Sequence, residues 1–547
     1  MGITETQKTS TEEGFPNNPF VPPKCDICFI NNLPPELLSH IFDAGTADDG
    51  TRDRDDAIDP RDLLRELDAN RADRENAPDT DVEMREELEE DDGGAETHDE
   101  VDSDGVAPCD YPALPFQVLV ANVCRHWRDV AYSTPSLWTT TAITPNAGLS
   151  PEPGLTLLAR SKGLPIDVCM HCPARHYDDP HAPSDDDVKS IFSIFIPHIH
   201  RWRMMTFGVA KYNLIYEFLS AASGPSVSSA PHLTTLELYH YEKTEEFGTF
   251  GYPSMSKHFT LFGGSAPSLT TVALWAVHID WSQLWIASAP NLRELGLGYH
   301  AEDVRPSWAQ FATILRGASA LEKLTLYQSG PSGDPAEWFI EPAPGCHANL
   351  NSPVQLPRVT HLALGFHSEA RAIGFLQKLH FPALVHLVLE FSDNDYTDFV
   401  RALARPIHPC LLQRAFAQEP PWNVLSRLKS LKIIGLPCSA ECVGTLYGEL
   451  QNLWLLNVSF SSLPPLFLDI LGTRCTLTGR GDVWLPRMGT LYVSGSSGRA
   501  LREVVQKRRD VGVPLGALYV EKSSEVEYED VKWLMENVET LKFFERA

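Results

Sequence analysis

The sequence contains no long apolar run and no excess of positive charge. No stretch of about 18 apolar residues, the length needed to span a bilayer, occurs in it, and its first segment, MGITETQKTSTEEG, has no apolar core of the signal-peptide type. We therefore expect a protein that is neither secreted nor inserted in a membrane. The 73 acidic residues outnumber the 45 basic ones, giving a net charge of −28. Because such a chain repels phosphate backbones, we expect no direct binding to DNA or RNA.

Cysteine is scarce and irregularly spaced. The 11 cysteines are odd in number and follow no regular pattern, which is typical of reduced thiols in a cytoplasmic or nuclear protein. Two CxxC pairs, Cys25 with Cys28 and Cys169 with Cys172, supply four sulfurs that could hold zinc. The pairs lie far apart in the chain and in different predicted elements. Independent thiols are the favoured interpretation, and no metal or other cofactor is expected.

Common enzyme motifs are missing as well. The sequence contains no GxxxxGK[ST] phosphate loop, no HExxH zinc helix, no GxSxG elbow and no GxGxxG fingerprint. We therefore expect a binding protein and not an enzyme. The alternative, a hydrolase or transferase with a dispersed active site, requires a deep pocket that holds titratable groups with shifted pKa values.

Charge is concentrated in one part of the chain. Residues 44–110 contain 26 acidic and 7 basic residues, for a net charge of −19, which leaves −9 for the rest. Low hydrophobicity and runs of charge cannot repay the entropy of ordering, so we predict a disordered insert here. Two stretches rich in helix formers, 59–70 and 81–90, are too short to be stable alone.

Two apolar helical patterns flank this insert. The first, LPPELLSHIF at 33–42, has two prolines suited to a first helical turn, followed by an apolar face. The second, LPFQVLVANVCRHWRDVAYSTPSLW at 114–138, repeats apolar residues at steps of three and four from Val120 to Val130. Both patterns predict amphipathic helices whose apolar faces need a partner.

The segments LPPELL, VCRHWRDVA and TPSLW resemble the F-box family, specifically a large group of fungal F-box proteins. This resemblance implies a three-helix motif that binds the Skp-type adaptor of a cullin-RING ubiquitin ligase. The insert is a departure from the family, which usually has a short turn after the first helix. Internal packing is the alternative role for the residues that the resemblance assigns to adaptor binding. These are Leu33, Pro34, Leu37, Leu38, Ile41, Phe42, Val120, Val123, Cys124 and Trp127.

A short phrase recurs in the C-terminal half of the chain. It consists of an apolar residue, two variable residues, an apolar residue, one variable residue and a third apolar residue. Six copies have a proline two positions before the phrase, beginning with Pro231. Phrases such as PHLTTLEL and PALVHLVL resemble leucine-rich repeats, in which short strands line a curved sheet. The eleven copies begin at Leu233, Leu269, Leu292, Leu321, Val359, Leu384, Leu428, Leu453, Met488, Leu515 and Val538.

The match to leucine-rich repeats is incomplete. The asparagine or cysteine that usually follows the strand is absent from all copies, and serine takes its place in five of them, from Ser329 to Ser523. A serine hydroxyl could bond a backbone group at this position. We expect a strand at 202–207 to open the array, and terminal elements at 155–168 and 530–543 to cover its ends.

These patterns predict a mixed α/β fold in which a small helical F-box, interrupted by a disordered acidic insert, precedes an irregular leucine-rich-repeat-like solenoid. The expected parts are a disordered tail at 1–29, the F-box at 30–143 with its insert at 44–110, a linking and capping region at 144–230, and the solenoid at 231–547.

Residues just beyond each strand of such a solenoid should lie along one edge. Several are aromatic or histidine, and aromatic anchors often dominate binding energy, so we predict that they bind a protein client. Covering of the loops is the alternative role. The candidates are Tyr239, His240, Tyr299, His300, Tyr327, Phe366, His367 and Phe391.

The resemblance implies a non-catalytic receptor subunit of a ubiquitin ligase. The F-box would hold the Skp-type adaptor, and through it a cullin-RING ligase. The solenoid would hold a client, so that a lysine of the client comes within reach of the ubiquitin-conjugating enzyme. The alternative is a repeat scaffold that binds proteins without entering a ligase. Adaptor binding separates these two hypotheses.

Overall fold

The computed structural model divides the chain into two compact units, which are described separately. One unit consists of Met1–Arg52 and Ala113–Trp138, and the other of Asp53–Pro112 and Thr139–Ala547. The structure describes residues 33–50, 57–58, 115–143, 152–172, 184–225, 227, 229–241, 249–255, 259–339, 353–392, 394–406, 423–458, 466–473, 483–522 and 524–545. The predicted tail at 1–29, the insert helices at 59–70 and 81–90, and Cys25 and Cys28 lie outside these residues.

The first unit is a small helical bundle with a core of its own. Leu38 and Phe42 of the first helix are buried in it, and the Phe42 ring lies 5.2 Å from that of Trp127. The Trp138 indole closes the bundle by donating a hydrogen bond to the carbonyl of Ala131 over 2.8 Å. The elements are α1 (Pro35–Gly50), α3 (Phe116–Val123), α4 (Arg125–Ser133) and the 3-10 helix η2 (Pro135–Trp138).

The helix α1 extends into the segment predicted to be a disordered insert. It continues to Gly50, and a Cβ at Gly45 would overlap the ring of Phe116 on α3. The close approach of the two helices therefore depends on glycine at this position. The segment 44–110 therefore shares its first residues with α1, and its bounds as an insert stay a prediction.

The second unit is built on one curved sheet of 15 strands in the order β1-β17-β16-β15-β14-β13-β12-β10-β8-β7-β6-β5-β4-β3-β2. The neighbours pair in parallel except β1, which is antiparallel to β17. The strands of this sheet are β1 (Ala57–Ile58), β2 (Thr140–Ile143), β3 (Ile166–Cys172), β4 (Trp202–Val209), β5 (Thr235–His240), β6 (Thr271–Trp275), β7 (Glu294–Gly298), β8 (Lys323–Tyr327), β10 (His361–Gly365), β12 (His386–Glu390), β13 (Ser430–Ile433), β14 (Leu455–Val458), β15 (Thr490–Val493), β16 (Ala517–Glu521) and β17 (Thr540–Phe544).

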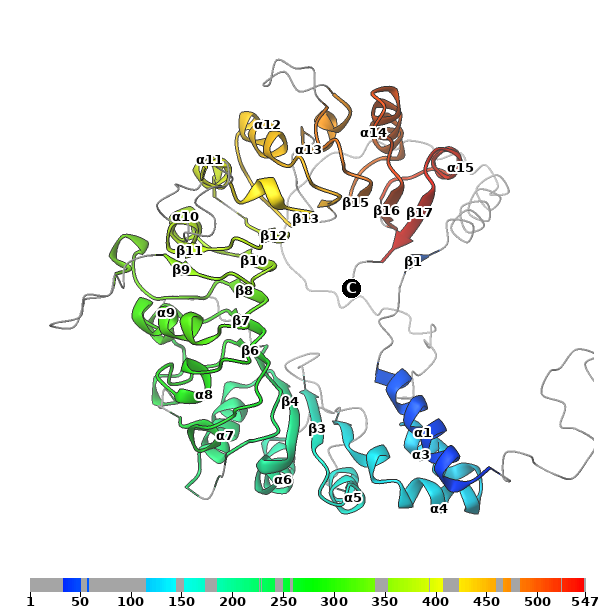
Figure 1. The fold of residues 1–547 in the computed structure, drawn as a ribbon, viewed down its shortest axis with the longest axis vertical. Coiled ribbons are helices and arrows are strands. Elements are labelled where there is room, and N and C mark those ends of the chain that lie inside the picture. The colour runs from blue at the N-terminus through cyan, green and yellow to red at the C-terminus, as the bar shows by residue number, and fades with distance from the viewer. Residues whose placement is uncertain are drawn as a thin grey trace, which may run out of the picture. The chain divides into compact units, whose positions relative to one another are not determined.

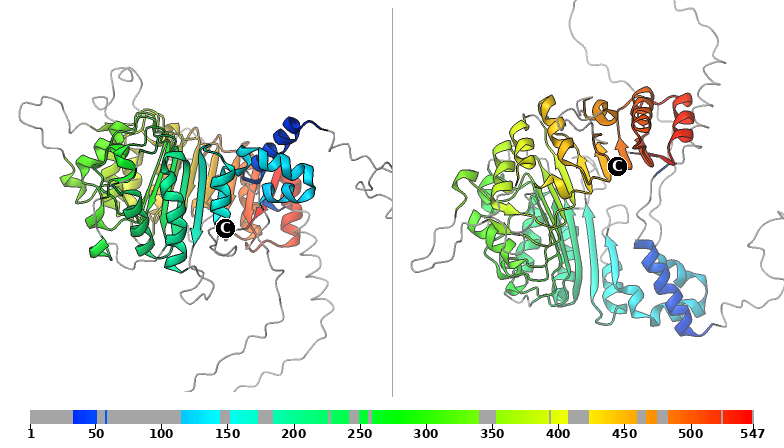
Figure 2. Two further views of the ribbon diagram at one scale, coloured as in Figure 1. Left: turned by 90° about the horizontal axis from the view of Figure 1, so that it is seen from below. Right: turned by 45° about the horizontal axis from the view of Figure 1, so that its top comes forward.

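Helices cover the outer side of this sheet, while the strands line its inner side (Figure 1). Figure 2 shows the same arrangement from two further directions. The helices are α5 (Glu152–Arg160), α6 (Asp185–Phe195), α7 (Tyr212–Ala222), α8 (Leu284–Ala287), α9 (Trp308–Gly317), α10 (Glu369–Lys378), α11 (Thr397–Ala404), α12 (Ala440–Glu449), α13 (Leu466–Asp469), α14 (Gly498–Asp510) and α15 (Tyr528–Asn537).

Short 3-10 helices and one two-stranded sheet complete the connections. The 3-10 helices are η4 (Ile196–Arg201), η5 (Pro253–Met255), η6 (Leu261–Gly264), η7 (Glu302–Val304), η8 (Pro335–Glu337), η10 (Leu425–Arg427) and η11 (Ile470–Gly472). The small sheet pairs β9 (Val354–Gln355) with β11 (Leu379–His380). Within the described part of the chain, no helix combines the length and apolarity needed to cross a membrane.

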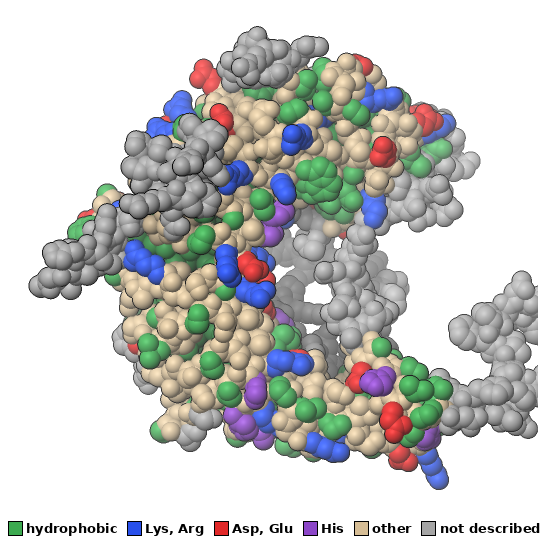
Figure 3. Space-filling model, viewed as in Figure 1, with side chains coloured by type: hydrophobic (Ala, Val, Ile, Leu, Met, Phe, Trp, Pro, Cys, Tyr) green, Lys and Arg blue, Asp and Glu red, His purple; other side chains and the backbone are tan. Residues whose placement is uncertain are grey.

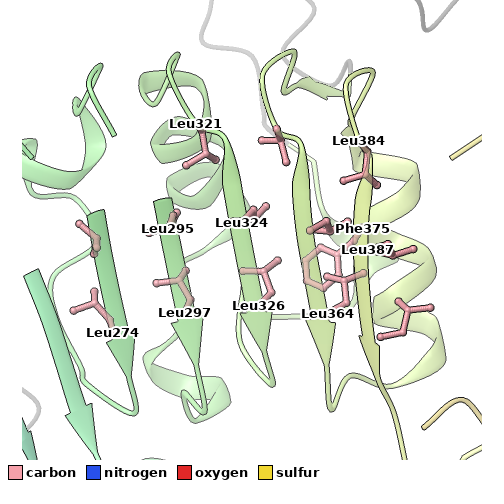
Figure 4. Packing of buried hydrophobic residues seen from close by; sticks show 14 of the residues in the cluster. Leu274, Leu295, Leu297, Leu321, Leu324, Leu326, Leu364, Phe375, Leu384 and Leu387 are labelled. Carbon is pink, nitrogen blue, oxygen red and sulfur yellow. The ribbon is translucent and has the colours of Figure 1, made fainter. Parts of the chain in front are cut away.

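The predicted repeat is confirmed, because each of the eleven phrases forms a strand of the sheet. The middle apolar residues pair in register, as in Leu295 with Leu324 and Leu324 with Leu362. All three apolar positions of each phrase are buried, and Figure 4 shows such leucines pointing from the strands toward the helices. The apolar faces of these strands together form one continuous core.

The recurring prolines lie in the turns that lead into the strands. The amide of Leu233 donates to the carbonyl of Ala230, and the amide of Leu292 donates to Ala289. Each bond closes a four-residue turn whose second residue is the proline, for example Pro231. Proline is favoured at this position because its fixed φ suits the turn.

The ends of the sheet differ from the repeats between them. The predicted opening strand at 202–207 is β4, and β3 and β2 precede it. The predicted helix and strand at 155–168 correspond to α5 and β3, and the predicted terminal elements correspond to α15 and β17. At the other edge, Ala57 pairs with Phe544 and Ile58 with Phe543. Residues 57–58 of the predicted insert therefore form β1, the edge strand of the sheet.

Candidate functional sites: an exposed apolar set and an aromatic strip

Four apolar side chains of the helical unit point away from its core. Leu37 and Ile41 on α1 are 50% and 47% exposed, and Leu119 and Val123 on α3 are 48% and 60% exposed. Each pair lies one helical turn apart, and α1 packs against α3. Figure 3 shows hydrophobic side chains gathered on the visible face of this unit. We call Leu37, Ile41, Leu119 and Val123 the exposed apolar set.

Three of the ten predicted adaptor-binding residues lie in the interior. Leu38, Phe42 and Val120 are at most 5% exposed and form the core of the helical unit. Their assignment to the adaptor surface is corrected, because a partner cannot contact them while the unit is folded. Leu37, Ile41 and Val123 belong to the exposed apolar set, and their role in binding stays a prediction.

The other four predicted residues lie at the border of this core. Pro34 is exposed, whereas Leu33, Cys124 and Trp127 are half-buried. The Cys124 sulfur accepts a hydrogen bond from the backbone amide of Trp127 over 3.4 Å and so caps the start of α4. Cys124 therefore has a structural role, and a role in binding stays a prediction.

Sequence reasoning missed Leu119. It assigned the neighbouring Val120 to the adaptor surface, whereas the structure buries Val120 and exposes Leu119. The signal that could have found it is its spacing of four residues from Val123, which places both side chains on one face of α3.

Aromatic rings form a continuous strip on the inner side of the sheet, across the ends of strands β3 to β10. Trp275 lies at its centre, 6.0 Å from Tyr239, 5.5 Å from Tyr299 and 5.6 Å from Tyr327, measured between ring centroids. Phe366 extends it from Tyr299 and Tyr327, and His171 and Tyr241 extend it beyond Tyr239. We call His171, Tyr239, Tyr241, Trp275, Tyr299, Tyr327 and Phe366 the aromatic strip.

Glycines beneath the strip hold these rings close to the backbone. Trp275 pairs in register with Gly298, and a Cβ there would lie 2.8 Å from two carbons of the Trp275 ring. Tyr327 covers Gly365 of the neighbouring strand in the same way. The rings can lie on the sheet only because these positions lack a side chain.

Strained turns place two further rings in the strip. Tyr299 and Phe366 follow β7 and β10 directly and have left-handed φ values of 54° and 55°. Ala276 and Gln328, at the ends of β6 and β8, have φ values of 55° and 47°. This conformation is unfavourable for bulky residues, and such strain often marks functional sites.

Four predicted client-binding residues lie in the interior. His240, His300, His367 and Phe391 are at most 7% exposed. Their assignment to a client surface is corrected, because their side chains pack against the elements that follow the strands. Tyr239, Tyr299, Tyr327 and Phe366 are only half-buried and belong to the aromatic strip, where their role in binding stays a prediction.

Two of these buried histidines occupy the position at which leucine-rich repeats usually have asparagine. His300 Nε2 bonds the carbonyl of Val277 over 3.1 Å, and His367 Nε2 bonds that of Leu326 over 3.0 Å. These bonds join each strand end to the preceding repeat. The predicted serine at this position, Ser329, bonds the ring of His300 over 2.8 Å, whereas the Ser496 hydroxyl does donate to a backbone carbonyl, that of Ser494.

Two carboxylates stand beside the strip. Glu237 hydrogen-bonds Tyr239 and accepts from the Thr206 hydroxyl over 3.2 Å. Glu390 hydrogen-bonds Tyr327, and burial raises the pKa of Glu390 while Tyr327 and Lys432 lower it. Burial first, and then the adjacent carboxylate, raises the pKa of Tyr239 and of Tyr327. Both phenols therefore stay protonated and donate to the carboxylates.

The described residues contain no group of three or more histidine, cysteine or acidic side chains arranged to hold a metal ion. Of the two CxxC pairs, the second lies on β3, where Cys169 is half-buried. Burial and then the charge of Glu237 raise the pKa of the Cys169 thiol.

Comparisons with known proteins assign no family to this chain. No protein-family model and no curated protein matches the chain. Among solved structures, it is similar to a chain in the crystal structure of the Rad7 and Elc1 complex from yeast. The TM-score is 0.32 and the sequence identity 12%, over 67% of this chain and 72% of that chain.

Proposed function

We propose that the protein is the substrate-recognition subunit of a cullin-RING ubiquitin ligase. In this proposal the helical unit is an F-box that binds a Skp-type adaptor, and the sheet unit is a leucine-rich-repeat-like solenoid that binds a protein client. The protein supplies no catalytic group and no cofactor. It brings the client near the ubiquitin-conjugating enzyme and works in the cytoplasm or the nucleus.

The exposed apolar set is the observation that supports this proposal most strongly. Leu37, Ile41, Leu119 and Val123 leave four large apolar side chains in water on a unit that has a complete core without them. Burying the apolar area that they still expose would favour a complex, at about 25 cal/mol per Å² of area removed from water. Neighbouring exposed apolar groups of this kind mark interaction surfaces.

The segments LPPELL and VCRHWRDVA, which resemble F-box proteins, supply α1 and the junction of α3 with α4. They include Leu38, Val130 and Ala131 of the core, and Leu37 and Val123, two of the four members of the exposed apolar set. The resemblance gives the identity of the partner, a Skp-type adaptor, and the geometry gives the side chains that would meet it.

The test is co-purification of the full chain with a Skp-type adaptor. We expect the wild type to capture the adaptor and Leu37→Asp to weaken capture at least tenfold, because a carboxylate would be buried in an apolar interface. Leu155→Asp is the matched control, since Leu155 is 49% exposed on α5 of the other unit. A folded wild type that captures no adaptor would favour the alternative, a repeat scaffold outside any ligase.

A further inference from the structure

Two rings of the aromatic strip, those of Trp275 and Tyr327, present a face and not an edge to the space in front of the sheet. Trp275 and Tyr327 each rest one face on a glycine of the next strand, Gly298 and Gly365. The opposite face of each ring is therefore directed away from the sheet, where a ligand can stack on it. The face of an aromatic ring carries the negative part of its quadrupole and attracts cations.

Hydrogen bonds to carboxylates strengthen the attraction of two tyrosine rings for cations. Tyr239 donates to Glu237 and Tyr327 donates to Glu390. A phenol that donates to an anion is polarised, so its ring becomes richer in electrons and a better acceptor for a cation. Each of these tyrosines thus combines a ring face with an adjacent carboxylate, the two groups that a guanidinium can contact at once.

One of the two carboxylates already has a cation beside it. Lys432 on β13 stands beside Glu390 and offsets part of its charge. The carboxylate of Glu237, which meets Thr206 and Tyr239, is therefore the stronger cation site of the two.

The length of the strip suits an extended peptide. Glu237 on β5 and Glu390 on β12 are separated by five steps between neighbouring strands in the sheet order. At about 4.8 Å per step the separation is about 24 Å, which an extended chain covers in about seven residues. The intervening rings of Trp275 and Tyr327 lie between these two ends.

We propose that the aromatic strip binds an extended segment of a client protein through arginine side chains that stack on Tyr239, Trp275 and Tyr327. This inference rests on the proposed function, in that it gives the chemistry of the client. Arginine fits better than lysine because its planar guanidinium covers a ring face while its N–H groups donate to the carboxylate. A client segment with arginines spread over about seven residues would reach both carboxylates.

Three labelled peptides test this inference by fluorescence anisotropy with the full chain at about 150 mM salt, an ionic strength that screens exposed charges. Each has ten residues of glycine and serine with three positions occupied by arginine, by lysine or by citrulline, the neutral isostere of arginine. We expect the arginine peptide to bind at least tenfold more tightly than the citrulline peptide and severalfold more tightly than the lysine peptide.

Variants locate the site. We expect Trp275→Ala to weaken arginine-peptide binding at least tenfold, and Glu237→Gln, which keeps the shape of the side chain, to weaken it severalfold. Tyr519→Ala is the matched control, since Tyr519 stacks on Tyr492 over 4.1 Å on the same side of the sheet outside the strip. Urea unfolding of each variant confirms that it is folded.

Binding that Trp275→Ala and Glu237→Gln both leave unchanged would overturn the inference, because the peptide would then be held elsewhere on this acidic chain. Equal binding of the arginine and citrulline peptides would overturn it as well. Adaptor capture is measured without peptide and depends on residues of the helical unit. A failure of adaptor capture is therefore distinguishable from a failure of peptide binding.

Discussion

At the scale of single residues, histidine performs a structural task in this sheet. His300 and His367 are buried and bond backbone carbonyls of the preceding repeat. Burial lowers the pKa of each from 6.5 to about 3, with nearby arginine charges acting in the same direction. Both rings are therefore neutral in the folded protein at any pH at which it is expected to work.

Acid should destabilise the fold through these two rings. The unfolded chain takes up protons on them below pH 6.5 and the folded chain does not until about pH 3. The free energy of unfolding therefore falls as the pH drops through this window, by up to about 1.4 kcal/mol per pH unit and histidine. We expect His300→Gln combined with His367→Gln to reduce the loss of stability between pH 7.5 and 5.0.

Urea unfolding at both pH values measures this effect. His232→Gln provides the control, because His232 is an exposed histidine of the same sheet unit. Equal losses of stability in the wild type and in the double variant would show that the two buried rings do not cause the acid sensitivity.

At the scale of elements, the strand ends bring together rings from separate repeats. Trp275, Tyr327 and Tyr239 come from β6, β8 and β5, and glycine on β7 and on β10 leaves room for the rings of Trp275 and Tyr327. Gly296 and Gly298 lie on the same side of β7, but only Gly298 lies beneath a ring in close contact. The two glycines therefore differ in what a methyl group would meet.

We expect Gly298→Ala to destabilise the sheet unit by about 1 to 3 kcal/mol, because the new methyl group would force the Trp275 ring out of its place. Gly296→Ala is the matched variant, since a Cβ there would make ordinary contacts of 3.7 Å or more. It should be neutral or slightly stabilising, because alanine loses less backbone entropy on folding. Urea unfolding of both variants makes the comparison, and equal unfolding midpoints would contradict this account of the glycine.

At the scale of the whole molecule, the residues that the structure describes form two separate hydrophobic cores. One holds Leu38, Phe42 and their neighbours in the helical unit, and the other runs through the sheet unit. Each unit is compact by itself. The unit proposed to bind the adaptor and the unit proposed to bind the client thus have separate cores.

Leu38→Ala should destabilise the helical unit alone. The side chain is fully buried, and its truncation typically costs 2 to 5 kcal/mol. We expect hydrogen exchange to lose protection in α1, α3 and α4 while β5 to β8 keep theirs. Leu37→Ala, at the exposed neighbouring position, should leave both patterns within about 0.5 kcal/mol of the wild type. A loss of protection in β5 to β8 on Leu38→Ala would show that the two units unfold together.

The sequence by itself determined the repeated strands and the turns before them. The phrase that begins at Leu233 specifies which side chains face the core, and Pro231 specifies the turn before it, because both signals act over a few residues. It also determined that two apolar segments, at 33–42 and 114–138, belong to one small motif, whereas the division of the second segment into α3, α4 and a 3-10 helix came from the structure.

The tertiary structure alone decided which apolar and aromatic residues are available to partners. Leu37 and Leu38 are identical neighbours, yet packing against α3 and α4 buries only Leu38. Tyr299 and His300 are adjacent as well, and only the histidine turns inward. Apolar periodicity reports that a face will be covered, but which element covers it depends on contacts between residues far apart in the chain. The aromatic strip and the pairing of Ala57 with Phe544 exist only because the sheet brings distant segments together.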